Sequence, residues 1–388
     1  MQEITSTMLT REEAIAHAQA IADTVIQAHI VASEKARRQS QKTIQAFKDA
    51  GLVRLLVPRR WQGHELSFDV LADLVIEVGK VDASAAWCFA FLMVHGWLLA
   101  HLPDEAQQDV WEINPDALLA VSIIPVGRSC PVPGGYRLSG RWDFVSGINH
   151  CEWSMLMGSN QRYFLLPASD YRIEDTWFAA GLSASGSNTV VVEEAFVPEH
   201  RTVTLADLRT YGQSPGVRLN NGTLYQLSVP EAFPVPLVAA ILGAAWGAYE
   251  TWKGQLSGAT TTLTGERPAE MSHVQIRLAE VFQSIKEAEL VLRHILARLC
   301  EGRLFSEREQ LALRLDYASI AARCRLAAQV MYGHSGGRAN FLNSPMRRYA
   351  ADITAMAAHT RLNSDTAAEG YGRFELGVGA NTRDPYAS

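Results

Sequence analysis

The chain has 388 residues, of which 48% are hydrophobic and 20% are charged, and its net charge is −6. This length and apolar content suffice for a large core divided between two or three domains, and without a Lys/Arg block nothing indicates a nucleic-acid partner. The five cysteines are scattered and never form a Cys-x-x-Cys pair. That distribution argues against a disulfide framework or a zinc site and predicts a reducing, cytoplasmic compartment.

Residues 1–115 are predicted to form a helical domain. Apolar residues recur at helical spacing over 14–26, and the pattern continues over 44–52. Two further helices are expected over 69–78 and 83–100. So far the chain shows only helical patterning, which favours a bundle at its start.

The segment 83–100 is nearly free of charge and about long enough to span a bilayer. His95 and Gly96 interrupt it, however, and no second span accompanies it. A helix that is apolar all round is also typical of the middle of a large helical domain. We therefore predict a buried helix with Asp82 or Ser84 as its N-cap, and no membrane partner.

The residue pattern of the chain changes from helical to strand-like near residue 118. Short runs of strand-forming residues, separated by Gly, Ser, Asn and Pro, predict a β-domain over 116–228. The expected strands cover 118–124, 135–145, 153–157, 163–167 and 189–193. Helical patterning then returns and lasts to Asp365, so residues 229–388 are predicted to be a helical bundle.

Two segments carry a resemblance to a known fold. They are Gly134–Gly147, which contains Phe144-Val-Ser-Gly147, and Met346–His359, which begins with a basic pair and continues at helical spacing. Together they resemble the acyl-CoA dehydrogenase fold, which implies an N-terminal helical domain, a central β-barrel domain and a C-terminal four-helix bundle. In that family the late helix typically supplies a glutamate that removes the substrate's α-proton. Here His359 and Thr360 hold that place, so the resemblance implies a retained fold and a changed reaction.

Within that superfamily the chain is more similar to the oxygenase components of two-component flavin-dependent monooxygenases. The similarity is carried by Ser146–Cys151, by His95 within Val94–Trp97, by His359 and by the ending Tyr371–Gly377. It implies hydroxylation of a small phenolic or indolic substrate through a C4a-hydroperoxyflavin, with molecular oxygen as co-substrate. Reduced FAD or FMN would come from a separate NAD(P)H-flavin reductase, in keeping with the lack of a Rossmann glycine fingerprint. It also implies a homotetramer.

The resemblance assigns roles to particular residues. His359 and His95 are the candidates for orienting and deprotonating the substrate, because imidazole titrates near neutral pH. The hydroxyl of Ser146 stands where family members hydrogen-bond flavin N5, and Ser122 would hold the flavin or the substrate hydroxyl. The complete set of predicted cofactor-binding residues is Ser122, Ser146, Gly147, His150, Gly336 and Gly337.

Each candidate also has a purely structural interpretation. His95 within an apolar helix is more often a satisfied core residue, and His359 is a cation that a helix C-terminus favours. His150 would then hydrogen-bond a turn, and Gly336-Gly337 would end a helix. The aromatic residues Trp87, Phe89, Phe91 and Trp97 are expected mainly in the core, although one or two of them could line a ring-binding pocket.

Three alternatives stay open at this point. The first is an acyl-CoA dehydrogenase or oxidase whose base is elsewhere, with Glu250 and Glu369 as the candidates. The second is an oxygenase that acts on nitrogen or sulfur on the same fold. The third is a non-catalytic helical scaffold, which the polar residues at flavin-facing positions disfavour.

Overall fold

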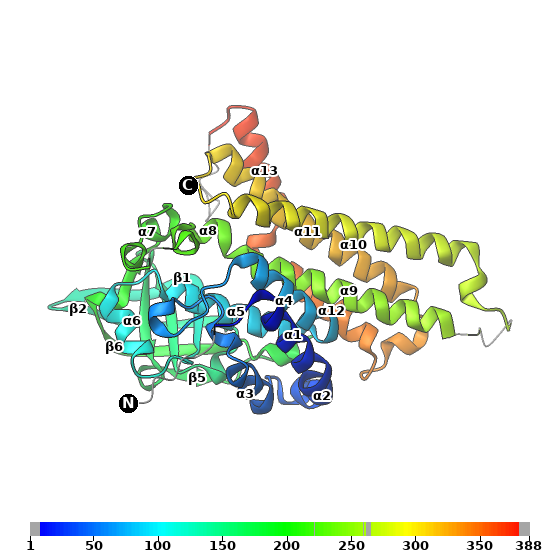
Figure 1. The fold of residues 1–388 in the computed structure, drawn as a ribbon, viewed down its shortest axis with the longest axis horizontal. Coiled ribbons are helices and arrows are strands. Elements are labelled where there is room, and N and C mark those ends of the chain that lie inside the picture. Colours follow the sequence, from blue (N-terminus) through cyan, green and yellow to red (C-terminus); the bar gives the residue numbers. More distant parts are fainter. Residues whose placement is uncertain (1–7, 221, 259, 261–264, 380–388) are drawn as a thin grey trace.

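The computed structural model describes residues 8–220, 222–258, 260 and 265–379. The strands gather at one end of the molecule, and long helices run toward the other end (Figure 1). These long helices are α9 (Pro234–Gly258), α10 (Ser272–Leu299) and α11 (Glu307–Gly333). Together with α12 (Pro345–Ala357) they pack against one another as a four-helix bundle.

The N-terminal part contains six α-helices among the described residues. They are α1 (Arg11–Ile21), α2 (Gln27–Ala36), α3 (Gln41–Asp49), α4 (Phe68–Val81), α5 (Ala83–Leu99) and α6 (Asp104–Trp111). Helix α4 packs against α9, which joins this part of the chain to the bundle. All residues of α5 are buried, which confirms the predicted buried helix.

The start of α5 is set by one of its two predicted caps. Asp82 Oδ1 accepts a hydrogen bond from the backbone N–H of Ala85 at 2.7 Å, so Asp82 is the N-cap. Ser84 instead lies inside the first turn, and its hydroxyl donates to the carboxylate of Asp352 on α12 at 3.3 Å. The two residues therefore have different functions: one begins the helix, and the other ties it to the bundle.

One described segment is long and apolar enough to cross a membrane. It is the run Val229–Gly258, which comprises α8 (Val229–Ala232) and α9. The protein itself buries 94% of its most apolar window. This is how the central helix of a large helical bundle is expected to look.

Among the described residues, seven strands form one sheet in the order β5-β6-β2-β1-β3-β4-β7. Their bounds are β1 (Leu119–Val132), β2 (Gly135–Val145), β3 (Trp153–Gly158), β4 (Arg162–Pro167), β5 (Arg172–Glu174), β6 (Asn188–Pro198) and β7 (Thr202–Thr204). Only β1 and β3 are parallel, while the other neighbours are antiparallel. All seven lie within 116–228, although the domain boundaries themselves stay predictions.

Strand β1 is longer than the sequence pattern predicted. Its first part pairs with β3 and its second part with β2, and the register shifts between Ser122 and Gly127. The segment Pro125-Val-Gly127, which follows the predicted strand 118–124, is therefore an irregularity within a longer strand. A Cβ at Gly127 would lie 2.3 Å from the ring of Trp142, so glycine lets that indole cross the strand. The short edge strands β5 and β7 were not predicted, because three residues are too few to show an alternation of apolar and polar side chains.

The end of the chain corrects one expectation about His359. Helix α12 ends at Ala357, and His359 lies beyond it as the N-cap of the short turn Thr360–Leu362. His359 is thus not part of the late helix. The described chain then continues through α13 (Ser364–Glu375). The remaining short helix, α7 (Leu205–Arg209), follows β7.

Candidate active site

Five aromatic rings from three segments form a continuous column. Trp87, Phe91 and His95 follow one another along one face of α5, with ring centroids 4.9 Å and then 5.5 Å apart. His359 meets the Trp87 end at 5.9 Å, and Phe233, just after α8, stacks on His95 at 6.0 Å. The structure therefore brings the two predicted catalytic histidines to one column, on either side of two α5 rings.

His95 presents one nitrogen without a protein partner. Its Nδ1 lies 2.8 Å from the carbonyl oxygen of Leu119 on β1, and since a carbonyl only accepts, Nδ1 carries the hydrogen. The side chain is 2% exposed, and Nε2 is buried without a hydrogen bond. Burial lowers the pKa of His95 to about 4. At neutral pH the imidazole is therefore uncharged, with an acceptor lone pair on Nε2.

His359 has the opposite arrangement of its two nitrogens. Its Nδ1 accepts the backbone N–H of Arg361 at 3.2 Å. Burial, followed by the charge of Arg361, lowers the pKa of His359 to about 4. In the neutral ring the hydrogen is then on Nε2, which can donate. The column thus offers one hydrogen-bond acceptor, on His95, and one donor, on His359. Because the ring of His359 is neutral, it is not the cation at a helix C-terminus that a purely structural interpretation predicted.

A chain of hydroxyl groups lies beside the column. Ser146 Oγ accepts the indole N–H of Trp87 at 3.2 Å and lies 2.9 Å from Ser187 Oγ, which in turn lies 2.7 Å from Ser185 Oγ. Ser185 and Ser187 are buried, whereas Ser146 is half-buried. Ser146 is consequently the member of this chain with solvent access.

Gly147 fixes the turn that follows Ser146. Its φ is +71°, and its N–H donates to the carbonyl oxygen of Ser185 at 3.0 Å. A Cβ here would lie 3.0 Å from the Cys88 sulfur on α5. Glycine is needed both for the left-handed backbone and for the close approach of α5. Gly147 therefore positions Ser146 against the column.

The loop that carries Ser185 and Ser187 is anchored by Asp352. This carboxylate is buried, and its Oδ1 accepts the backbone N–H of Leu182 at 2.6 Å. Burial, and then the charge of nearby Asp82, raise the pKa of Asp352 to about 7. Asp352 belongs to α12, the helix that precedes His359 in the chain. The same helix therefore also holds the loop whose Ser187 contacts Ser146.

Ser122 is placed by the same strand that fixes His95. It is 3% exposed and follows Leu119 by three residues on β1. The backbone N–H of Ile124 donates to its Oγ at 3.4 Å. Its predicted contact with flavin or substrate stays a prediction.

His150 lines a different cavity from the column. It lies one short turn after Gly147, and the cavity, of about 340 Å³, also includes Arg38 and Gln39 between α2 and α3. Its Nε2 is buried without a partner, and burial lowers the pKa of His150 to about 4. The structure does not bring it into the column, and its cofactor role remains a prediction.

Gly336 and Gly337 lie in an exposed turn after α11. Gly336 has a φ of +70°, and a Cβ at either position would meet no atom within 4 Å. The ring contacts that build the column, all within the described part of the chain, do not include this turn. Within one chain the pair therefore stays apart from the two histidines.

An aromatic pair is formed by Phe144, two residues before Ser146, and the half-buried Trp177. Phe144 is 65% exposed although it precedes a buried residue, and its φ is +62°. Its ring meets that of Trp177 edge-on at 6.1 Å, where the pairing of β2 and β6 is irregular. A bulky residue in the left-handed region stores strain, which is a frequent feature of functional sites. The exposed ring of Phe144 provides an apolar surface two residues from Ser146 in the chain.

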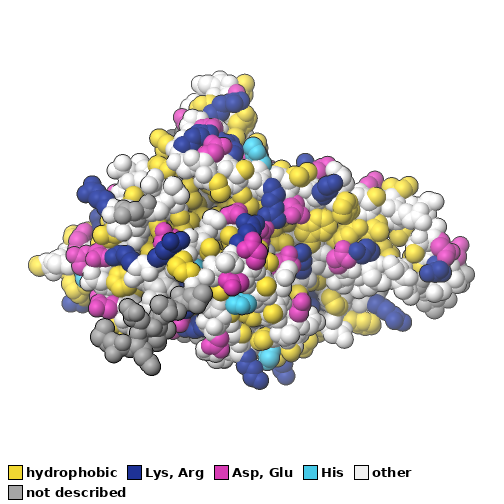
Figure 2. Space-filling view, in the orientation of Figure 1, with side chains coloured by type: hydrophobic (Ala, Val, Ile, Leu, Met, Phe, Trp, Pro, Cys, Tyr) yellow, Lys and Arg dark blue, Asp and Glu magenta, His cyan; other side chains and the backbone are white. Residues whose placement is uncertain are grey.

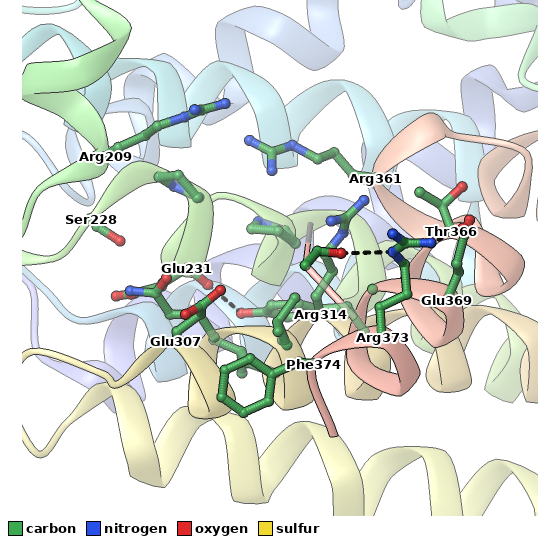
Figure 3. A pocket seen from close by; sticks show the side chains of 18 of the residues that line it. Arg209, Ser228, Glu231, Glu307, Arg314, Arg361, Thr366, Glu369, Arg373 and Phe374 are labelled. Carbon is green, nitrogen blue, oxygen red and sulfur yellow. Dashed lines mark hydrogen bonds and ion pairs between the residues drawn. The ribbon is translucent and has the colours of Figure 1, made fainter. Parts of the chain in front are cut away.

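A large cavity adjoins this site (Figure 3). Its volume is about 600 Å³, within the range of roughly 300–1,000 Å³ that is usual for small-molecule sites. Segments from α8, α11 and α13 line it, together with Arg361. Because Arg361 also bonds to His359, the cavity and the column share a wall.

Several of these residues were not expected from the sequence. Trp87 and Phe91 were expected mainly in the core, with one or two of their cluster allowed at a ring-binding pocket, and Ser185, Ser187 and Phe233 were not considered as site residues. The only local signal for the two serines is the polar run Ser183-Ala-Ser-Gly-Ser-Asn188, which is typical of an ordinary turn. Nothing local indicates that this turn reaches α5.

Comparison with known proteins places this geometry in a family. Residues 236–364 match the family described as "Acyl-CoA dehydrogenase, C-terminal domain". The oxygenase component of the FADH(2)-dependent resorcinol hydroxylase from Rhizobium sp. is 34% identical over 369 residues, which covers 89% of this chain and 90% of that protein. The chain belongs to the oxygenase components of the flavin-dependent monooxygenases.

Other relatives agree with this assignment of the monooxygenase. The pigment production hydroxylase of Rhodococcus sp. is 30% identical, with coverage of 89% and 91%. The crystal structure of the HsaA monooxygenase from M. tuberculosis superposes with a TM-score of 0.90 at 26% identity, over 96% of this chain and 99% of that one. The acyl-CoA dehydrogenase-like fold is thereby confirmed.

The carboxylates required by the dehydrogenase alternative are unsuitably placed in the monooxygenase. Glu250 is exposed on α9 and forms an ion pair with Lys253. Glu369 is on α13, lines the 600 Å³ cavity and lies 3.8 Å from Arg373. Neither is a member of the column. The reaction of an acyl-CoA dehydrogenase is therefore not supported.

Proposed function

We propose that the monooxygenase hydroxylates a small phenolic or indolic substrate at the column of rings. The observation that carries this proposal is the buried, unpaired Nε2 of His95. A buried acceptor without a partner costs about 1–3 kcal/mol, so such an atom is expected to meet a ligand donor. A phenol O–H or an indole N–H is such a donor on a flat apolar body that suits the neighbouring rings.

His95 then acts as the acceptor for the substrate O–H or N–H. Withdrawing that hydrogen enriches the ring in electron density, which is what electrophilic hydroxylation requires. His359 is the partner donor, through the hydrogen on its Nε2. The carbonyl of Leu119 and the backbone N–H of Arg361 hold the two imidazoles in these complementary tautomers.

The residues beside the column fit a reduced flavin. Ser146 is half-buried with its hydroxyl 2.9 Å from that of Ser187, and Phe144, two residues earlier in the chain, offers an exposed ring. When bound, reduced FAD or FMN supplies the electrons that divide molecular oxygen between the substrate and water. Ser146 is proposed to retain the proton at flavin N5, with Ser122, Gly147 and His150 as further contacts. Burial of the column excludes the water that would favour release of hydrogen peroxide.

The partners follow from the same proposal. The oxygenase component takes its flavin from a separate NAD(P)H-flavin reductase in the cytoplasm, where the five described free cysteines would stay reduced. A homotetramer is supported by exposed apolar side chains on α10, namely Ile276, Phe282 and Leu290. Hydrophobic side chains gather over α9 and α10 in Figure 2. The open turn at Gly336-Gly337 would then be available to flavin held by another copy.

The test supplies chemically reduced FAD or FMN to the purified protein without oxygen. Oxygenated buffer is then added with resorcinol, 4-hydroxyphenylacetate or indole-3-acetate as the probe, and product and hydrogen peroxide are measured. We expect at least one probe to be hydroxylated with an oxygen atom that derives from O₂. Release of hydrogen peroxide equivalent to the flavin, with no hydroxylated product from any aromatic compound, would overturn the proposal.

A further inference from the structure

The 600 Å³ cavity is joined to the column by two short segments. Phe233 stacks on His95, and its neighbours Glu231 and Pro234 line the cavity. On the other side His359 accepts the backbone N–H of Arg361, whose side chain lines the cavity. The cavity wall is therefore connected to the column near both histidines. A substrate whose ring lies at the column would extend a substituent toward this cavity.

Glu231 is the unusual residue of this lining. Its side chain is only 4% exposed, and neither carboxylate oxygen makes a hydrogen bond of normal geometry. Burial raises the pKa of Glu231, while polar contacts with Ser228 and Gln310 act in the opposite direction. A carboxylate that is almost fully buried without well-formed hydrogen bonds is costly to maintain. It is therefore expected to have a ligand.

The backbone of Glu231 is held firmly in place. The phenol O–H of Tyr317 on α11 donates to its carbonyl oxygen at 2.6 Å. Its N–H donates to the carbonyl oxygen of Ser228 at the start of α8. Because the main chain is tied at both groups, the carboxylate has a defined position relative to Phe233 and the column.

The charges around the cavity indicate which ligand group fits. In the view of Figure 3 the side chains of Arg209 and Arg361 lie on one side, opposite Glu231 and Glu307. The two arginines disfavour an ammonium group in the cavity, because like charges repel each other. An anionic group placed against Glu231 would be repelled by this carboxylate and by that of Glu307. A neutral hydrogen-bond donor is the remaining match for Glu231.

We propose that Glu231 is a specificity-determining residue that accepts a hydrogen bond from a hydroxyl group at the far end of the aromatic substrate. This assignment rests on the proposed function, because it places the substrate ring at the column. It narrows the substrate class to phenols or indoles with a hydroxyl-bearing substituent. A site built for such a donor rejects analogues that lack it, because the carboxylate is then left unpaired.

The experiment compares matched substrates and matched variants. The substrates are phenols with 4-hydroxyalkyl chains of increasing length, each paired with the 4-alkyl phenol of the same size, and the corresponding amines and carboxylates. The variants are Glu231→Gln and the control Glu307→Gln, which makes the same change at an exposed residue of the same cavity. The readout is kcat/KM for hydroxylated product, with reduced flavin supplied.

For the unsubstituted enzyme we expect a preference of about tenfold or more for the hydroxyl-bearing phenol at one chain length. Glu231→Gln should reduce that preference to within about threefold, and Glu307→Gln should keep it. The proposal is overturned if no chain length shows a preference, if amines or carboxylates are preferred, or if both variants lose the preference equally. Should Glu231→Gln fail to fold, the substrate series on the unsubstituted enzyme decides alone.

Failure of the proposed function gives a different result. In that case no phenol of any series is hydroxylated. Calorimetric binding of the same pairs to the protein without flavin then tests Glu231 separately. Equal affinities for the hydroxyl and alkyl members would overturn its role as a hydrogen-bond acceptor.

Discussion

The backbone N–H of Leu182 donates to the carboxylate of Asp352 at 2.6 Å, across 170 residues of sequence. Leu182 begins the loop that carries Ser185 and Ser187, and Asp352 belongs to the helix that leads to His359. One hydrogen bond thus links the hydroxyl chain to the histidine column. Gly181 permits the contact, because a Cβ there would lie 2.2 Å from the carbonyl oxygen of Ala351.

Replacing Asp352 by alanine should weaken both stability and coupling. The buried N–H of Leu182 would lose its acceptor, which costs about 1–3 kcal/mol in the free energy of unfolding. The loosened loop should also raise the yield of hydrogen peroxide per reduced flavin. Urea unfolding and a peroxide assay measure the two effects. Asp365→Ala, at an exposed position on α13, should show neither, and equal behaviour of the two variants would contradict the prediction.

His95→Gln should lower kcat/KM for hydroxylation by roughly 10²–10⁴-fold. The reason is the loss of the only group in the column with a buried acceptor lone pair opposite the substrate. The control is His101→Gln, because His101 is also buried and lies close after α5 but bonds to Ser214 outside the column. The measurement is kcat/KM for hydroxylation by both variants under steady-state conditions. A comparable loss in both would indicate a packing effect rather than a catalytic one.

The pH dependence of kcat/KM should lack an acidic limb near pH 6.5. The pKa values of His95 and His359 are lowered from 6.5 to about 4, mainly by burial. Protonation of the folded enzyme, and with it loss of the neutral imidazoles, therefore begins only well below pH 6. Rates measured between about pH 5 and pH 8 should change little. A limb with a midpoint at the ordinary histidine value would show that the column is hydrated.

The contribution of His95 to the free energy of unfolding should decrease as the pH is lowered, even where the hydroxylation rates stay constant. An unfolded-state histidine binds a proton near pH 6.5, whereas folded His95 does so only near pH 4. Its contribution is complete above pH 6.5 and is lost as the pH falls toward 4. Asp352 acts in the opposite sense, because its pKa is raised. Thermal unfolding of the unsubstituted protein and His95→Gln should therefore converge as the pH is lowered.

Ser187→Ala should uncouple oxygen use from hydroxylation. It removes the partner that lies 2.9 Å from Ser146 Oγ and so frees that hydroxyl to rotate. We expect a severalfold increase in the ratio of hydrogen peroxide to product and a loss of about 1 kcal/mol in stability. Ser183→Ala is the matched control in the same loop, because its hydroxyl bonds to Ala179 instead. An unchanged ratio in Ser187→Ala would exclude this role for the hydroxyl chain.

Much of the fold was readable from local patterns. The buried helix α5 followed from its nearly uncharged apolar run, and Asp82 was one of its two candidate caps. Strand β1 was cut short because Pro125 and Gly127 usually mark a turn, whereas Trp142 crosses the strand there. His359 was placed in a helix that ends two residues earlier. Such ends depend on tertiary contacts that a periodic pattern does not contain.

The sequence by itself determined which chemical groups the enzyme has available, including the imidazoles of His95 and His359 and the hydroxyl of Ser146. Only the tertiary structure decided that Trp87 lies between His359 and Phe91, that Nε2 of His95 is left free, and that Glu231 is buried. The physical reason is that side-chain type and helical spacing are local properties. Desolvation and hydrogen-bond pairing instead arise from segments that are far apart in the chain and meet only on folding.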